Sequence, residues 1–137
     1  MTRNRTSAKQ AGSRFERSVA DYLAAQLADD RIDRRVKTGA KDRGDIAGLR
    51  TLNGGRVIAE CKDYGGRFEV GPWLAEAETE RGNDDAVAGV VIAKRRGMTA
   101  PASQVVFMTL ADFVTLLGLQ RPDLGGMETA PEIEVLK

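Results

Sequence analysis

The chain has no histidine and only one cysteine, Cys61. Without histidine, the protein cannot activate a nucleophile through an imidazole, bind zinc through one, or use a histidine-dependent nuclease mechanism. A single cysteine cannot form an internal disulfide, which fits the reducing environment of a cytoplasm. We therefore expect a cytoplasmic protein whose chemistry does not depend on histidine.

The chain also lacks any apolar stretch as long as a membrane span, and its first residues lack the apolar segment of a secretory signal. The 137 residues, 42% hydrophobic and 30% charged, have an ordinary globular composition. We expect one domain over residues 1–137 and no membrane partner. Its core covers about residues 13–118, between a basic N-terminal arm (1–12) and an acidic tail of low order (120–137).

The net charge of +1 hides an uneven distribution of charge. Residues 1–67 carry 15 Lys and Arg against 9 Asp and Glu, whereas residues 68–137 carry 6 against 11. A mixed, solvated surface is the simpler interpretation of such numbers. A polyanionic partner is the alternative, with carboxylates in the basic half reserved for a metal ion.

Residues 45–62 predict a β-hairpin. The dipeptide Asn53-Gly54 stands between two short apolar runs. It favours a two-residue type I′ turn, in which both central residues need positive φ. With that turn, Asp45 lies opposite Lys62 on the partner strand.

This register places three charged residues together. Because side chains alternate along a strand, Asp45, Glu60 and Lys62 share one face of the sheet, and Cys61 points to the other. Asp45 and Glu60 become diagonal neighbours, about 7–8 Å apart at Cα, so a divalent cation with ligand distances of about 2.1 Å can bridge their carboxylates. A register shift of two residues keeps this arrangement, whereas a single one-residue bulge breaks it.

Apolar spacing predicts the remaining elements. Ser13 opens a helix, and Gly71-Pro72 begins a second one that exposes Glu76, Glu78 and Glu80. The continuous apolar run 86–93 is typical of a strand covered on both faces, which joins the hairpin through a right-handed crossover. Short strands at 31–37 and 104–108 and a helix starting after Thr109 complete the chain. The expected fold class is α/β: a central mixed β-sheet, with an antiparallel hairpin and a parallel crossover strand, flanked by helices.

Glu16 has two interpretations. The sequence Ser13-Arg14-Phe15-Glu16 matches a capping box, in which the Glu16 carboxylate would cap the helix. Glu16 also lies at the inward edge of the helix, where its carboxylate can point to the acidic residues of the hairpin. Both roles are compatible.

The series Glu16, Gly44-Asp45 and Glu60-Cys61-Lys62 resembles the PD-(D/E)XK nuclease superfamily, and within it is similar to archaeal-type Holliday-junction resolvases. The resemblance covers roughly residues 13–118, with Gly44 at the position of the proline in the superfamily name. It implies a restriction-endonuclease-like core, a symmetric homodimer, DNA as substrate and no organic cofactor. It also implies that the cytoplasm is that of a prokaryotic cell or a phage-infected host.

The resemblance also implies roles for the matching residues. Asp45, Glu60 and the backbone carbonyl of Cys61 would bind Mg²⁺ or Mn²⁺, with Glu16 reaching the metal through water. Lys62 would orient the attacking water as a base or stabilise charge. Independently of the resemblance, the alternation of the strand predicts that the small side chain of Cys61 packs in the core.

The leading hypothesis is a metal-dependent DNA endonuclease that resolves four-way junctions. An exonuclease or restriction-like nuclease and a non-catalytic DNA-binding protein remain alternatives. Two copies would be joined near Phe68, Val70 and Trp73, and Trp73 is more typical of core or subunit-interface packing than of a platform for base stacking. The expected DNA-binding surface consists of basic residues from the arm, the loop before Asp45 and the end of the buried strand: Arg3, Arg5, Lys9, Lys41, Arg43, Lys94, Arg95 and Arg96.

Overall fold

The computed structural model describes residues 4–37, 39 and 41–122. These residues form three α-helices, five strands and one 3₁₀ turn. In order these are α1 (Arg5–Gln26), β1 (Asp33–Arg34), β2 (Ile46–Ala47), β3 (Val57–Lys62), α2 (Val70–Asn83), β4 (Ala88–Ala93), η1 (Pro101–Ser103), β5 (Val105–Phe107) and α3 (Leu110–Leu116).

The strands form one mixed sheet in the order β1-β2-β3-β4-β5. β3 and β4 run parallel over six residue pairs, from Val57 opposite Ala88 to Lys62 opposite Ala93. The other neighbouring pairs are antiparallel. The fold is therefore α/β with the expected hairpin and parallel crossover, and β3 and β4 end at the same edge of the sheet.

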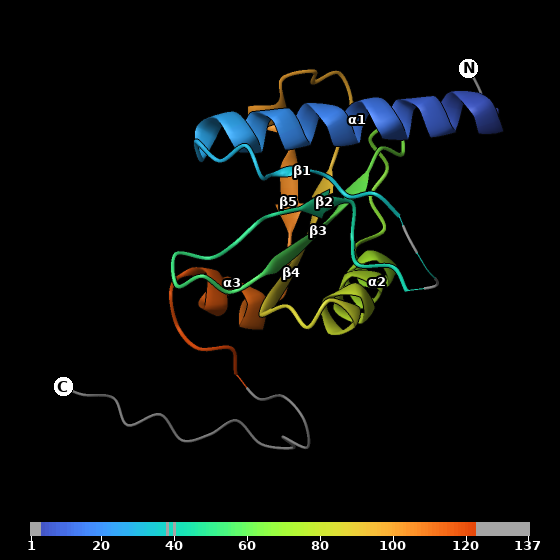
Figure 1. Cartoon of the computed structure of the whole chain (residues 1–137). Coiled ribbons are helices and arrows are strands. Elements are labelled where there is room, and N and C mark those ends of the chain that lie inside the picture. The colour runs from blue at the N-terminus through green and yellow to red at the C-terminus, as the bar shows by residue number, and fades with distance from the viewer. Residues whose placement is uncertain (1–3, 38, 40, 123–137) are drawn as a thin grey trace.

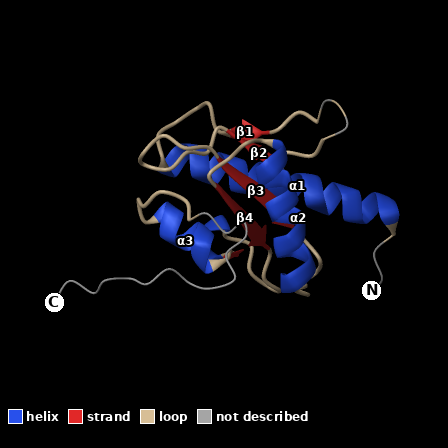
Figure 2. Cartoon of the chain, turned by 90° about the horizontal axis from the view of Figure 1, so that it is seen from below, coloured by secondary structure: helices blue, strands red, loops and turns tan. Residues whose placement is uncertain are grey.

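The helices cover both faces of the sheet: α1 lies on one face and α2 on the other (Figures 1 and 2). The short α3 lies near the start of β4, and its Leu116 packs against the same cluster as α1. On the α1 side, Phe15 and Val19 pack against Val57, Ala59 and other buried residues. On the α2 side, Trp73 and Ala77 pack with Ile58. All six residues of β4 are buried, as the continuous apolar run predicts. Residues of β3 therefore alternate between two separate hydrophobic clusters.

α1 begins eight residues before Ser13. Its N-cap is Asn4, whose side chain accepts a hydrogen bond from the Ser7 amide at 2.7 Å. Residues 5–12 of the predicted basic N-terminal arm therefore belong to α1, while residues 1–3 lie outside the described chain. The capping-box interpretation of Glu16 is wrong, because Glu16 lies in the interior of the helix. Gly12 within the helix weakened the signal, since glycine costs about 1 kcal/mol relative to alanine there.

The hairpin between β2 and β3 differs from the predicted one at its turn. Arg50 pairs with Arg56, the Thr51 amide donates to the Gly55 carbonyl, and Gly54 has φ +87°. This is a three-residue loop closed by a left-handed glycine, not a two-residue type I′ turn. The predicted pairing of Asp45 with Lys62 is therefore wrong.

A second irregularity restores the predicted faces. Between the Arg50–Arg56 bridge and the Ile46–Ala59 pair, the β2 side has one residue more than the β3 side. This bulge includes Gly48, whose φ is +86° and at which a Cβ would lie 2.5 Å from the Arg31 carbonyl. The longer turn and the bulge together shift the register by two residues, so Asp45 remains on the same face as Glu60 and Lys62.

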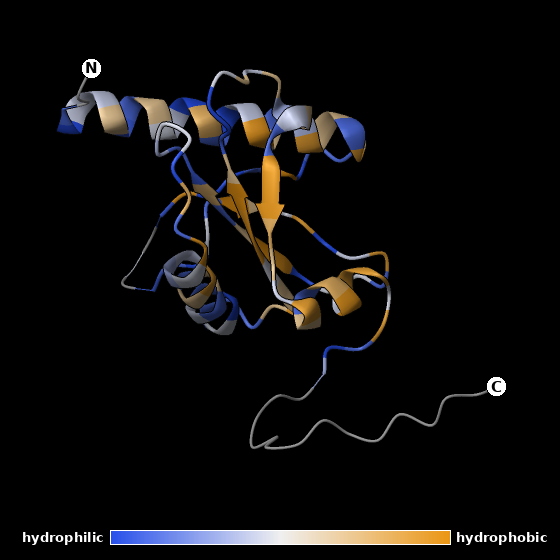
Figure 3. Ribbon diagram, turned by 180° about the vertical axis from the view of Figure 1, so that it is seen from behind, coloured by the Kyte–Doolittle hydropathy of each residue, from blue (hydrophilic) through white to orange (hydrophobic). Residues whose placement is uncertain are grey.

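Among the residues that the structure describes, no helix is long and apolar enough to cross a membrane. Apolar side chains nevertheless gather on the outside near the last strand, where Figure 3 shows β5 and α3 in hydrophobic colours. Val106, Leu110, Phe113 and Leu117 are all exposed. Trp73 belongs to the buried core, one of the two places that the sequence allowed for it, while Phe68 and Val70 are exposed.

Candidate metal and nucleic-acid site

The last residues of β3 turn from apolar to charged on the face that α2 covers. Ile58 belongs to the core there, and Glu60 and Lys62 follow it at alternate positions. Glu60 is only 5% exposed. The Lys62 Nζ atom lies 3.6 Å from Glu60 Oε1 and 2.9 Å from Glu76 Oε2. The predicted carboxylate and lysine thus stand side by side at the sheet edge.

Asp45 lies just before β2 and is almost fully buried. Its amide donates to the Ala59 carbonyl, and its Oδ2 atom accepts a hydrogen bond from the Cys61 amide at 2.8 Å. Its Oδ1 atom lies 3.2 Å from the Nζ atom of Lys37. These contacts fix the Asp45 carboxylate beside the end of β3, next to Glu60.

Glu16 reaches this region from α1, on the other face of the sheet. Its Oε2 atom is bound by the Arg34 guanidinium at 2.8 Å. Burial and the negative charge of Asp45 raise the pKa of the Glu16 carboxyl, although Arg34 opposes the shift. Glu16 is therefore near Asp45, but it belongs to a different layer from Glu60.

Two further carboxylates, which the sequence interpretation placed on the solvent side of α2, lie against Glu60. Asp42, Glu60, Glu76 and Glu80 each offer a carboxylate oxygen, and these four atoms lie within 4.8 Å of one another. The prediction that Glu80 is exposed is wrong: it is 2% exposed. Its spacing from Trp73 is two helical turns, a signal that could have placed it on the buried face.

Neither oxygen of Glu80 has a hydrogen-bond partner in the described part of the chain, and the same holds for Glu60 Oε2. Burial, followed by the contact with Glu80 and the charge of Asp45, raises the pKa of Glu60. Burial likewise raises the pKa of Glu80, with Asp42 and Glu76 adding to the shift. In the absence of a cation, this pair therefore retains a proton at neutral pH.

Lys62 keeps its positive charge. Burial opposes protonation of its amine, but the hydrogen bond to Glu76 and the charge of Glu60 outweigh burial and raise the pKa of Lys62. Lys37 behaves in the same way beside Asp45. The two buried carboxylates of the hairpin thus each have a lysine ammonium group close by: Lys37 beside Asp45, and Lys62 beside Glu60.

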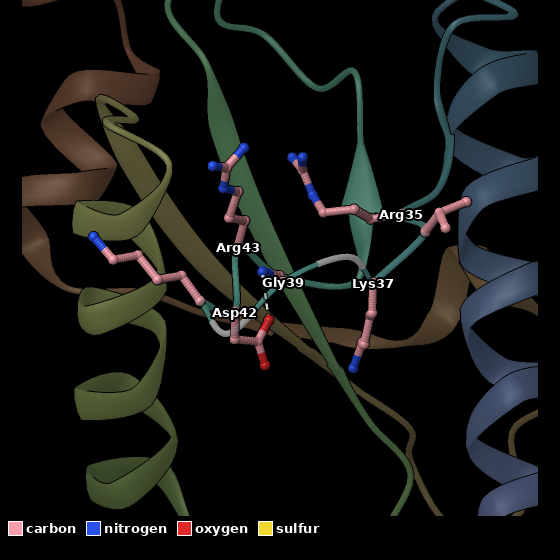
Figure 4. Close-up of a pocket in the computed structure, with 8 residues that line it drawn as sticks. Arg35, Lys37, Gly39, Asp42 and Arg43 are labelled. Atoms are coloured by element: carbon pink, nitrogen blue, oxygen red, sulfur yellow. Dashed lines mark hydrogen bonds between the residues drawn. The ribbon is translucent and has the colours of Figure 1, made fainter.

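A basic loop borders the carboxylates on one side. It lines a cavity of about 210 Å³ with Arg35, Lys37, Lys41, Asp42 and Arg43. Figure 4 shows Arg35 and Arg43 extending in one direction, and Lys37 and Asp42 in the opposite direction. The Arg35 guanidinium lies 3.6 Å from the buried Asp84 carboxylate, whereas Arg43 is exposed. Lys41 and Arg43, two of the predicted DNA-binding residues, lie here.

Other basic residues border the opposite side. Lys94, Arg95 and Arg96 follow β4 at the edge where β3 also ends, and the Lys94 amide donates to the Lys62 carbonyl. Arg96 and Arg67 line a hollow of about 580 Å³ together with Lys62.

The predicted basic residues of the arm lie on the helix or outside the described chain. Arg5 and Lys9 lie on the exposed first turns of α1. Lys9 lines a hollow of about 650 Å³ that also includes Glu16 and Lys37. Arg3 lies outside the described residues.

Cys61 packs against the cluster on the α1 side, as the alternation of the strand predicts. Burial, together with the nearby charges of Asp45 and Glu16, raises the pKa of its thiol. The thiol therefore holds its proton and has little nucleophilic character.

No protein-family model, curated protein or solved structure matches this chain.

Proposed function

We propose that the protein is a Mg²⁺- or Mn²⁺-dependent endonuclease that hydrolyses phosphodiester bonds in DNA, with four-way junctions as its preferred substrate. One observation carries the proposal. At the end of β3, the buried Glu60 carboxylate has an oxygen with no partner among the described residues, and it lies beside Asp45 and 3.6 Å from the Lys62 ammonium. A buried carboxylate of this kind is costly unless it binds a cation or a proton.

The donor set fits a hard divalent cation. Asp45 and Glu60 would hold it, and they offer the oxygen ligands that Mg²⁺ prefers. The predicted contributions of the Cys61 carbonyl and of Glu16 through water are part of the proposal. When bound, the cation would neutralise charge on the phosphate and lower the pKa of a bound water.

The residues of the chain supply the rest. Lys62 remains protonated, which favours its role as a stabiliser of phosphate charge over that of a base. The Cys61 amide and Lys37 orient the Asp45 carboxylate. The basic residues on both sides of the site would bind phosphates of the two flanking segments of a strand.

The preference for branched DNA requires two copies. A four-way junction has strands related by two-fold symmetry, and its resolution needs paired nicks. One chain supplies a single set of Asp45, Glu60 and Lys62, so the proposed enzyme is a homodimer. Its affinity for DNA should fall as salt rises, since phosphate contacts release counterions.

The experiment compares labelled four-way, flapped and linear DNA with purified protein in Mg²⁺, alongside sedimentation at micromolar concentration. Paired nicks in the four-way substrate by a dimer support the proposal. Equal cutting of all substrates by a monomer would favour an exonuclease or restriction-like enzyme. Salt-sensitive binding with no cutting in Mg²⁺ or Mn²⁺ would make the protein a DNA-binding module with a nuclease-like site.

A further inference from the structure

The acidic residues of α2 form a cluster separate from the Asp45 carboxylate. Glu76 and Glu80 lie one turn apart on the helix and meet Glu60 from β3. Asp42 joins them from the loop before β2, and the Asn83 side chain holds that loop against α2 by donating to the Asp42 carbonyl at 2.8 Å. Four carboxylates from three elements therefore converge on one point.

Glu80 is the residue that the fold does not explain. It is 2% exposed, and neither carboxylate oxygen has a partner among the described residues. Trp73 and Ala77, on the same face of α2, are buried in the core, so an apolar residue at position 80 would continue this packing. An unpaired carboxylate here costs several kcal/mol unless something compensates its charge.

The nearby basic residues are engaged elsewhere. Lys62 contacts Glu76 and Glu60. Arg81, next to Glu80 in the chain, binds Glu78 and the Ala86 carbonyl. In the described chain, no ion pair reaches Glu80. The remaining possibilities are a proton shared with Glu60 or a bound cation.

We propose that Asp42, Glu60, Glu76 and Glu80 form a binding site for a divalent cation of the Mg²⁺ or Mn²⁺ class, distinct from the Asp45 position and sharing Glu60 with it. Ligand oxygens about 2.1 Å from an ion lie up to about 4.2 Å apart. The spread of 4.8 Å thus closes onto an ion with a small inward movement. The exposed Asp42 and the Glu76 side chain, which is 42% exposed, leave a path for the ion.

A cation at this site would join the basic loop to α2. Asp42 precedes Arg43 and Gly44, and the chain then enters Asp45. Binding through Asp42 would therefore fix both the outward arginine and the Asp45 carboxylate. The metal binding itself needs no assumption about DNA, whereas this effect on the catalytic residues rests on the proposed nuclease function.

Isothermal titration of the full chain with Mn²⁺ tests the proposal. The informative variant is Glu80→Gln, which keeps the shape and removes the charge. Its matched control is Glu78→Gln, an exposed position two residues earlier on the same helix whose carboxylate binds Arg81 and Arg121. Asp45→Asn removes a ligand of the other position.

We expect two equivalents of Mn²⁺ for the wild type and for Glu78→Gln. Glu80→Gln should lose one equivalent or bind it at least tenfold more weakly. Asp45→Asn should keep the equivalent that depends on Glu80. Metal-free Glu80→Gln should unfold at or above the wild-type temperature, because an uncompensated carboxylate has been removed, and it should gain less stability from Mn²⁺.

Equal Mn²⁺ stoichiometry and affinity in Glu80→Gln and the wild type would overturn the inference, and would mean that the pair holds a proton only. The DNA assay is read separately. Absence of cleavage with intact Glu80-dependent binding removes the nuclease proposal and leaves the cation site. Cleavage by the wild type, with Mn²⁺ binding that does not depend on Glu80, does the reverse.

Discussion

The six residues of β3 alternate between two faces of the sheet that differ in character. Toward α1, Val57, Ala59 and Cys61 continue a hydrophobic cluster to the end of the strand. Toward α2, the strand begins with Ile58 in the core and ends with the buried charges of Glu60 and Lys62. Hydrophobic packing alone therefore accounts for the first face. On the second face, packing does not offset the free energy lost when the charges are removed from water. Such a concentration of shifted titratable groups at one edge is typical of functional sites.

The largest effect should come from removing the charged groups of the site one at a time. We expect Asp45→Asn, Glu60→Gln and Lys62→Met each to reduce DNA cleavage by about 10³-fold or more while the protein remains folded. The lost interactions stabilise the transition state more than the bound substrate. Single-turnover cleavage, with DNA affinity measured in parallel, provides the readout. Near wild-type cutting by any of the three would place the site elsewhere.

Disrupting the bulge should be the next largest effect. Gly48→Ala places a Cβ 2.5 Å from the Arg31 carbonyl at a residue with φ +86°. We expect a loss of about 2–3 kcal/mol or more in the free energy of unfolding, measured in denaturant. Gly54→Ala is a useful comparison: its φ is also positive, but nothing lies within 4 Å of its Cβ. A smaller loss for Gly48→Ala than for Gly54→Ala would show that the bulge tolerates a side chain.

The α1-facing side offers the opposite test. Cys61→Ser should leave cleavage nearly unchanged and cost about 1–3 kcal/mol of stability, because a hydroxyl there is poorly satisfied. The raised pKa of the thiol predicts slow alkylation of the native protein, which a thiol reagent followed by mass spectrometry can measure. Rapid alkylation that also abolishes metal binding would contradict the assignment of faces along β3.

The smallest expected effect is a dependence of stability on pH in metal-free buffer. The pKa values of Glu60 and Glu80 are raised in the folded chain, so the folded state binds more protons than the unfolded state above the ordinary value of 4.5. Stability should therefore fall as the pH rises from about 5 through neutrality. Thermal unfolding of the wild type and of Glu80→Gln would show a shallower dependence in the variant. A rise in wild-type stability attributable to this pair would contradict the raised pKa values.

The order of the helices and strands, and the charged end of one face of β3, could be predicted from the sequence alone. The continuous apolar run of β4 predicts burial on both faces, and the crossover then requires a parallel partner. The alternation of β3 places Glu60 and Lys62 on one face and Cys61 on the other, whatever the length of the turn. Period-two alternation is a local property, so it survives changes elsewhere in the chain.

The type of turn, the bulge and the burial of Glu80 could be learned only from the tertiary structure. Asn53-Gly54 is compatible with more than one turn, and the close approach of Gly48 to Arg31 determines the bulge. The burial of Glu80 depends on which side of α2 meets the sheet. Trp73 and Ala77 pack that side of α2 against the sheet. Glu80 lies on the same side of the helix and is therefore buried despite its charge. Contacts between distant segments determine these features. The spacing of residue 80 from Trp73 indicates only that both lie on one side of the helix, not that this side meets the sheet.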